Sequence, residues 1–204
     1  MAGDADILTG KSLPEFFKEL LGEARERQRL KVDDQTEFYL VNLLSEFVDP
    51  EKAWNREEDG KLRQEPLALL LTRALEAEAR AEQAAALRRI GDTSLWVTGF
   101  FSDSLEPRVV DARYYMSMGH LAYSSLARLQ SRQPIGGLYE ELAEKFGSIV
   151  DLLNEVSERV TLTSQQGVLR LYERFLKTGS VRLARLLAEE GVIPPLGRPV
   201  REVQ

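Results

Sequence analysis

A line of polar side chains at helical spacing is the part of the sequence best suited to binding or catalysis. Five polar residues recur at intervals of four, three, four and four: Arg113, Ser117, His120, Ser124 and Arg128. At 100° per residue, this spacing puts them on one face of an α-helix. His120 is the only histidine of the chain and would be the general base of a catalytic site. No acid partner stands at helical spacing from it, so we expect no catalytic residue here.

This polar stripe supports two interpretations. In the first, the stripe faces water, or His120 forms a hydrogen bond at the edge of the core. In the second, a further layer covers the stripe and creates a pocket for an anionic or amphipathic ligand. The side chains that would bind such a ligand are Arg113, Ser117, His120, Tyr123, Tyr115 and Trp96. A small-molecule sensor with its pocket around His120 is therefore one hypothesis for the function.

The opposite face of the same predicted helix is apolar. Its members are Tyr115, Met118, Ala122, Leu126 and Leu129, with Gly119 beside them, while Tyr123 flanks the polar stripe. Large aromatic side chains dominate the energetics of protein cores. The small Gly119 and Ala122 would let a neighbouring helix approach closely. We therefore expect residues 90–130 to form the central hairpin of the fold.

Motifs for metals, nucleotides and hydrolysis are missing. The chain has no cysteine and lacks the paired Glu-x-x-His motif of di-iron bundles. The acidic pair Asp33-Asp34 and the acidic run 57–59 are better explained as helix caps and solvated loop than as metal ligands. No glycine-rich phosphate loop is present, because Gly10-Lys11-Ser12 lacks the upstream glycine and follows no strand. We expect no metal site and no cofactor.

The C-terminal segment permits a hypothesis of DNA binding. Residues 163–204 carry seven basic and four acidic residues, and two predicted helices over 163–190 meet at a short turn that contains Gly179. Helix-turn-helix proteins insert their second helix into the major groove. Here that helix would present Arg182 and Arg185, but also two glutamates. A helical hairpin that closes the bundle explains the same pattern, so nucleic acid is the weaker alternative.

Helical periodicity runs through most of the chain. Ser12 and Glu15 form a capping-box signature, Asp33-Asp34 precede a second helix, and strong helix formers predict one long helix over Leu67–Ile90. Gly91-Asp92 would end or kink that helix. Further helices are expected over 94–101, 108–131, 138–146, 149–160, 163–177 and 180–191. The sequence predicts an all-α fold, an irregular multi-helix bundle of about eight helices with no sheet.

The predicted domain organisation is simple. We expect a flexible N-terminus over residues 1–11, a single helical domain over 12–191, and an extended C-terminal tail with three prolines over 192–204. Within the domain, the polar stretch 49–66 is predicted to be a surface loop, either a connector or a lid over a pocket.

Composition favours a cytoplasmic protein. The net charge of −6 lowers the expectation of binding to nucleic acid or anionic membranes, and the lack of cysteine fits a reducing compartment. No window of the sequence has the length and hydropathy of a transmembrane helix. The run YYMSMGHLAY looks like a motif of a bacterial family, but it indicates no function. We therefore expect a non-enzymatic protein that acts through protein–protein contacts, with a protein partner or with a second copy as a homodimer.

Overall fold

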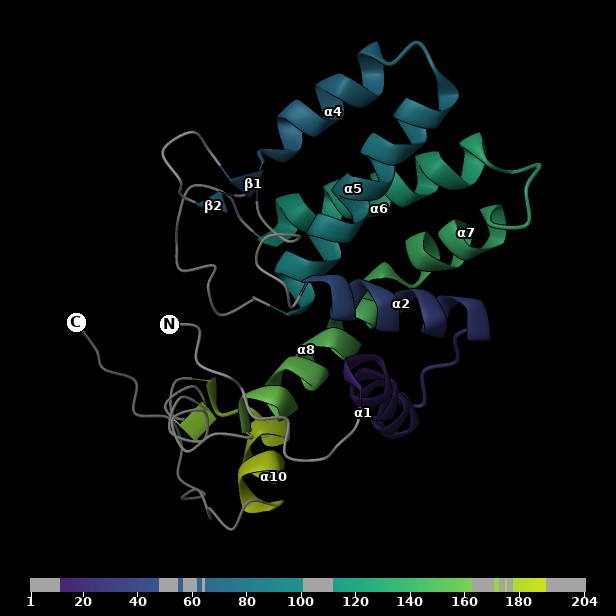
Figure 1. Ribbon diagram of the computed structural model, residues 1–204. Helices are drawn as coiled ribbons and strands as arrows, with labels where there is room; N and C mark the ends of the chain where they lie inside the picture. Colours follow the sequence, from purple (N-terminus) through teal and green to yellow (C-terminus); the bar gives the residue numbers. More distant parts are fainter. Residues whose placement is uncertain are drawn as a thin grey trace. The chain divides into compact units, whose positions relative to one another are not determined.

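The computed structural model describes residues 12–47, 55–56, 62–63, 65–100, 112–162, 171–172, 175 and 178–189. Helices dominate these residues, and the predicted all-α fold is confirmed (Figure 1). The helices are α1 (Leu13–Gln28), α2 (Asp34–Phe47), α4 (Leu67–Glu76), α5 (Arg80–Gly99), α6 (Ala112–Leu129), α7 (Gly136–Glu144), α8 (Phe146–Leu162) and α10 (Val181–Glu189). In the stretch predicted as a surface loop, the two-residue strands β1 (Asn55–Arg56) and β2 (Leu62–Arg63) pair antiparallel, with Asn55 opposite Arg63.

The chain divides into two compact units, Met1–Asn154 and Glu155–Gln204. Helix α8 is continuous across this boundary. The expected limits of the single domain and of the two terminal segments stay predictions. Residues 1–11, 192–204 and much of the predicted helix over 163–177 lie outside the described residues.

The start of α1 follows the capping box that the sequence predicts. The backbone N–H of Ser12 donates a hydrogen bond to Glu15 Oε2 at 2.8 Å, and the Ser12 hydroxyl donates to the same oxygen at 2.7 Å. These contacts stabilise the first turn, where backbone N–H groups have no partner within the helix. The C-terminal end of α1 is capped by Arg29, whose φ of 54° lies in the left-handed region.

The prediction of one helix over Leu67–Ile90 is wrong. Helix α4 ends at Glu76 and α5 begins at Arg80, so this range holds two helices separated by residues 77–79. The segment between them contains good helix formers, and tertiary packing overrides their weak preference. Gln83 Nε2 donates a hydrogen bond to the carbonyl of Ala74 at 3.2 Å, which satisfies one of the free carbonyl groups at the end of α4.

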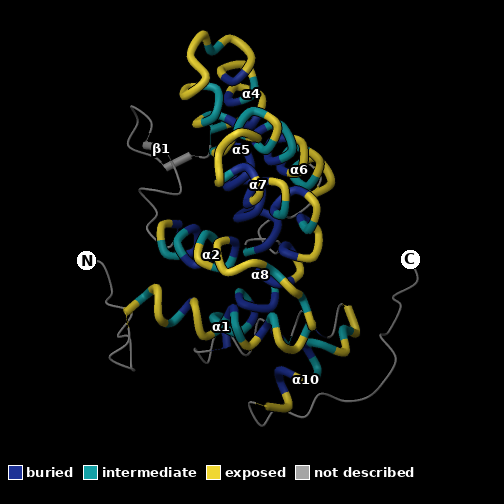
Figure 2. The backbone as a smooth tube through the Cα atoms, turned by 90° about the vertical axis from the view of Figure 1, so that its right-hand side faces the viewer, coloured by how far each residue is buried: buried dark blue, intermediate teal, exposed yellow. Residues whose placement is uncertain are grey.

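Helix α5 forms the centre of the first unit. It does not end at Gly91-Asp92 but continues to Gly99, and every residue from 90 to 99 is buried (Figure 2). Helices α4 and α6 both pack against it, and α7 packs against α6 (Figure 1). A helix buried on all sides needs either apolar side chains or polar side chains with hydrogen-bond partners. The charged Asp92, within the buried range, therefore needs such partners.

Two glycines let α6 approach α5. A Cβ atom at Gly91 would lie 2.5 Å from the ring of Tyr123, and one at Gly119 would lie 2.7 Å from Cβ of Ser94 and would overlap the ring of Phe146. The close approach predicted at Gly119 is therefore present. The pairs Gly91–Tyr123 and Ser94–Gly119 also show that α5 and α6 run antiparallel, because the contact position rises along one helix and falls along the other.

A carboxylate connects the start of α2 to α7. Glu141 accepts hydrogen bonds from the backbone N–H of Asp33 at 3.0 Å, from the Thr36 hydroxyl and from Lys145 Nζ at 2.7 Å. Lys145 also donates to the carbonyl of Lys31 at 2.7 Å. Burial raises the pKa of Glu141, but the donors from Lys145, Thr36 and Asp33 outweigh it, so the pKa lies below its ordinary value.

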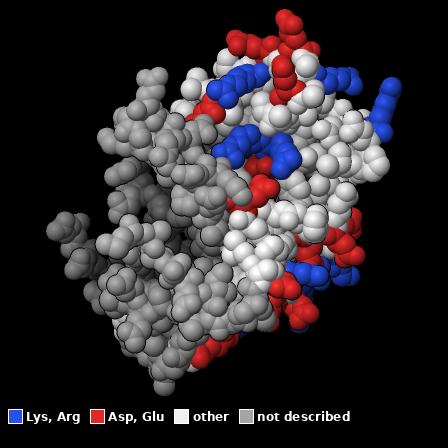
Figure 3. Space-filling model, viewed as in Figure 1, with Lys and Arg blue, Asp and Glu red and all other residues white. Residues whose placement is uncertain are grey.

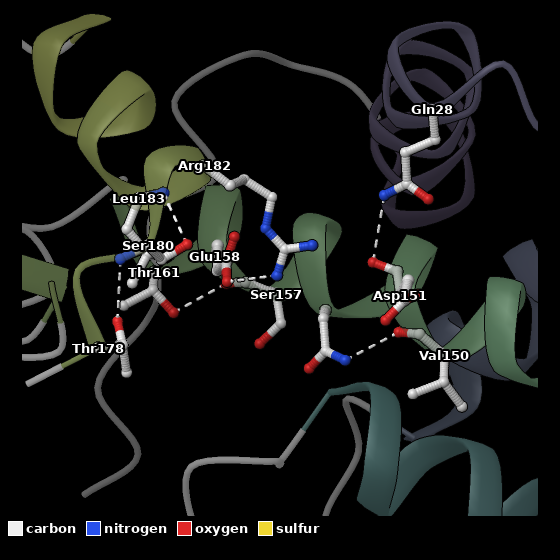
Figure 4. Close-up of polar contacts among 11 residues, drawn as sticks. Gln28, Val150, Asp151, Ser157, Glu158, Thr161, Thr178, Ser180, Arg182 and Leu183 are labelled. Carbon is white, nitrogen blue, oxygen red and sulfur yellow. Dashed lines mark hydrogen bonds and ion pairs between the residues drawn. The ribbon is translucent and has the colours of Figure 1, made fainter.

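The second unit has a core of its own. Its buried apolar members are Leu162, Leu171, Phe175, Leu183, Leu186 and Leu187. Within this unit, Arg182 of α10 forms an ion pair with Glu158 of α8 at 2.8 Å (Figure 4). The carboxylate of Glu158 is almost fully buried, at 2% exposure, whereas the side chain of Arg182 is 38% exposed.

Candidate functional site

A buried aspartate joins three helices of the first unit. Asp92 of α5 is 7% exposed, and its Oδ1 accepts hydrogen bonds from the hydroxyl groups of Tyr39 in α2 and Tyr123 in α6, the latter at 2.8 Å. Its Oδ2 accepts a hydrogen bond from Nε of Arg88, one helical turn earlier, at 3.3 Å. We call these four residues the Asp92 cluster.

Aromatic packing holds the Asp92 cluster in place. The ring of Tyr139 in α7 stacks on Tyr123 with centroids 6.1 Å apart and meets Tyr39 edge to face, also at 6.1 Å. The guanidinium of Arg88 lies over the Tyr39 ring, 5.8 Å from its centroid. Such contacts restrain both phenol rings, so their hydroxyl groups stay directed at the carboxylate.

Burial changes the proton affinity of the Asp92 cluster. It raises the pKa of Asp92 above its ordinary value, although the hydrogen bonds from Tyr39 and Tyr123 and the charge of Arg88 act in the opposite direction. Burial likewise raises the pKa of Tyr123 well above its ordinary value, and the negative charge of Asp92 adds to this effect. A general base must reach its substrate, and a carboxylate buried beneath three protein donors does not. The hydrogen bonds of the cluster join α2, α5 and α6 to one another.

An apolar groove of about 270 Å³ lies between α4 and α6, with α5 as its floor. Its lining includes Leu71 and Leu75 of α4, Leu87 of α5, and Met118 and Leu121 of α6. We call this feature the α4–α6 groove. It is distinct from the Asp92 cluster, although both depend on the packing of α6 against α5.

The rim of the α4–α6 groove exposes apolar side chains to solvent. Leu75 is 74% exposed and Leu121 is 48% exposed. Gln83 and Ser125 are the polar members of the lining. Leu69, on the same helix as Leu75, is also exposed at 55% but does not line the groove. Exposed apolar side chains beside a concave apolar surface are typical of sites that bind another protein.

The six residues predicted to bind a ligand lie in very different surroundings. Arg113, Ser117 and His120 are exposed, and Tyr115 is half-buried. Tyr123 and Trp96 lie in the core, at 0% and 3% exposure.

The ring of His120 is held at the edge of the core. Its Nδ1–H donates to the carbonyl oxygen of Ala143 in α7 at 3.0 Å. This bond is the one expected in the first interpretation of the polar stripe. A ligand at the six residues stays a prediction.

Sequence reasoning missed Asp92 because its neighbour Gly91 suggested a helix end. A usable signal was present, since Asp92 is the only charged residue in the run IGDTSLWVTGFF, and a charge within an apolar helix needs partners. The spacing of 100° per residue also put Tyr123 beside the polar stripe. Its ring is instead fully buried, because α7 packs on that side of α6 and supplies Tyr139.

Charge on the molecular surface is mixed. Basic and acidic side chains intermingle over the described part of the face drawn in Figure 3. Arg182, one of the two arginines behind the hypothesis of DNA binding, is paired with Glu158, and Arg159 is paired with Glu189 at 2.9 Å. These pairs reduce the positive charge that this helix pair would offer to a phosphate backbone.

Among the described residues, no three acidic or histidine side chains are grouped closely enough to hold a metal ion. The described helices also include none with the length and apolar character needed to cross a lipid bilayer. Comparison with known proteins gives no match to this chain, whether with protein-family models, curated proteins or solved structures.

Proposed function

We propose that this chain binds another protein through the α4–α6 groove, without catalysing a reaction, in the bacterial cytoplasm. The observation that supports this most strongly is the exposure of Leu75 and Leu121 at the rim of an apolar hollow. Complete burial of one leucine side chain contributes about 1.5–3 kcal/mol. Two such leucines, with Met118 and Leu71 beside them, supply the apolar anchor that a helix-in-groove contact needs.

The Asp92 cluster supports this function from inside the fold. Ile90 of α5 and Ala122 of α6 line the groove. Asp92, two positions after Ile90, and Tyr123, directly after Ala122, belong to the cluster. The hydrogen bond between Tyr123 and Asp92 thereby fixes one wall of the groove against its floor. A surface held in its binding shape before association avoids part of the entropic cost of ordering.

Photo-crosslinking at single positions tests this proposal. A benzophenone amino acid replaces Leu75 or Leu121 in chains expressed in the producing cell, and Leu69 serves as the matched control on α4. We expect protein adducts, identified by mass spectrometry, from positions 75 and 121 and few from position 69. Equal yields from all three positions, or none from any, would contradict a contact at the groove.

A further inference from the structure

A second hollow, of about 520 Å³, lies between the start of α1 and α2. Its lining includes Glu15 and Lys18 of α1 and Asp34, Glu37, Phe38 and Val41 of α2. We call this feature the α1–α2 hollow. The ring of Phe38 is 69% exposed, whereas Val41 beneath it is only 6% exposed. An exposed aromatic ring beside a concave surface is typical of a site that binds another molecule.

Carboxylates outnumber basic groups in the α1–α2 hollow. Its described lining carries three carboxylates, those of Glu15, Asp34 and Glu37, against the one ammonium group of Lys18, a formal charge of −2. Glu37 forms an ion pair with Arg25 at 2.5 Å. The hollow is still negative when this arginine is counted, so it attracts a basic partner and repels an acidic one.

Asp34 and Phe38 are placed to hold one guanidinium group between them. They are four residues apart on α2, so their Cβ atoms lie about 6 Å apart on the same face of the helix. Both side chains are exposed. An arginine that stacks on the ring, within about 6 Å of its centroid, can direct its N–H groups to a carboxylate one turn away.

The fold already holds an arginine of its own in this way. The guanidinium of Arg88 lies over the Tyr39 ring, 5.8 Å from its centroid, and Nε of the same arginine donates to Asp92 at 3.3 Å. One ring and one carboxylate thus bind a single guanidinium group. At Asp34 and Phe38 the ring and the carboxylate are present, but no described residue of the chain supplies the arginine.

We infer that the α1–α2 hollow binds a basic segment of another protein. An arginine of that segment stacks on Phe38 and pairs with Asp34, while an apolar side chain packs beside Val41. A second copy of this chain does not fit, because a two-fold contact would bring two negative hollows face to face. The lining of the α4–α6 groove shares no described residue with this hollow, so the inference does not rest on the proposed function.

Fluorescence anisotropy of two labelled peptides with the purified full chain tests this inference. One is a short amphipathic peptide of leucine and arginine, and the other has glutamate in place of every arginine. A contact of this size is weak and transient, so it is measured at equilibrium. We expect the chain to bind the arginine peptide and not the glutamate peptide.

Single substitutions locate the binding of the arginine peptide. Phe38→Ala and Asp34→Asn should each weaken it about fivefold, because each removes one of the two contacts of the guanidinium group. Lys18→Gln should strengthen it, because the lining loses its positive charge. Asp151→Asn, the same change at an exposed aspartate of α8, should leave the affinity unchanged.

Four results would overturn the inference. The first is a lack of binding to the arginine peptide. The second is equal weakening by Asp34→Asn and Asp151→Asn, which would show general attraction to an acidic chain. The third is unchanged affinity in Phe38→Ala with loss of binding in Leu75→Ala, which would place the peptide in the α4–α6 groove. The fourth is weaker binding by Lys18→Gln.

Discussion

Replacing Asp92 with alanine is expected to lower the free energy of unfolding by about 3 kcal/mol. The hydroxyl of Tyr123, which is fully buried, would lose its acceptor, and the hydroxyl of Tyr39 would lose the same one. A buried polar group without a partner costs about 1–3 kcal/mol. The Arg88 side chain is 51% exposed and can turn to water, so it adds little to the loss.

Urea denaturation of the purified chain measures this change. Asp151→Ala is the matched control, because Asp151 is an exposed aspartate within a helix of the same unit and its replacement should change stability by less than about 0.5 kcal/mol. If Asp92→Ala proved as stable as the control, the hydrogen bonds of the Asp92 cluster would not hold the fold together.

The difference in stability between the wild type and the Asp92→Asn variant is expected to depend on pH. Burial raises the pKa of Asp92 from its ordinary 3.8, so the folded chain keeps the proton to a higher pH than the unfolded chain. Stability falls with rising pH wherever the folded state binds more protons. The wild type should therefore lose stability relative to Asp92→Asn as pH rises from about 4 through the raised pKa. A wild type that gained stability relative to Asp92→Asn over this range would contradict the raised pKa.

Gly119→Ala is expected to destabilise the fold by about 2 kcal/mol, although alanine normally favours a helix over glycine by about 1 kcal/mol. The new methyl group would press on Cβ of Ser94 and on the ring of Phe146. Both neighbours are buried, so neither can move without disturbing the core. Overpacking of this kind costs about 1–3 kcal/mol. We expect a cost near the upper end, because the new atom would overlap the Phe146 ring, and the propensity gain of about 1 kcal/mol offsets only part of it.

Gly22→Ala provides the control for this substitution. Gly22 also lies inside a helix, α1, but a Cβ atom there would meet no other atom within 4 Å. The same chemical change should therefore stabilise the chain by up to about 1 kcal/mol. Thermal unfolding followed by circular dichroism would show opposite shifts in Tm for the two variants. Shifts in the same direction would contradict the close approach of α6 to α5.

Local signals in the sequence predicted those parts of the fold that depend on neighbouring residues. The capping box at Ser12 and Glu15 begins α1, because both partners lie within one turn. Helix α6 was expected because its polar and apolar residues repeat with the helical period. The inward position of Ala122 and Leu126 follows from the same pattern, since both are buried.

Features set by distant residues could not be predicted in this way. The break between Glu76 and Arg80 is decided by the packing of α4 against α5, and no glycine or proline marks it. Asp92 is tolerated inside α5 only because Tyr39 and Tyr123, which are 53 and 31 residues away in the sequence, satisfy its carboxylate. Helical periodicity carries no information about such partners.

In the α4–α6 groove, too, local patterns could be predicted from the sequence, whereas the arrangement of the helices could not. The pattern of α6 put Met118 on its apolar side, and α4 lies within the range that was predicted to be helical. Neither pattern could show that α4 and α6 lie on the same side of α5 and leave a hollow between them. The groove exists because the chain turns after Glu76 and α4 packs beside α5. The sequence did not predict this turn.

Native mass spectrometry of the chain purified from its producing cell under mild conditions tests whether the chain forms a complex through the α4–α6 groove. We expect the wild type and the control variant Leu69→Glu to appear in a complex heavier than one chain of 23.1 kDa. The double variant Leu75→Glu/Leu121→Glu should appear as a single folded chain, because charged side chains at the rim prevent burial of the groove. A wild type found only as a single chain, or a complex that survives both substitutions, would contradict a function based on this surface.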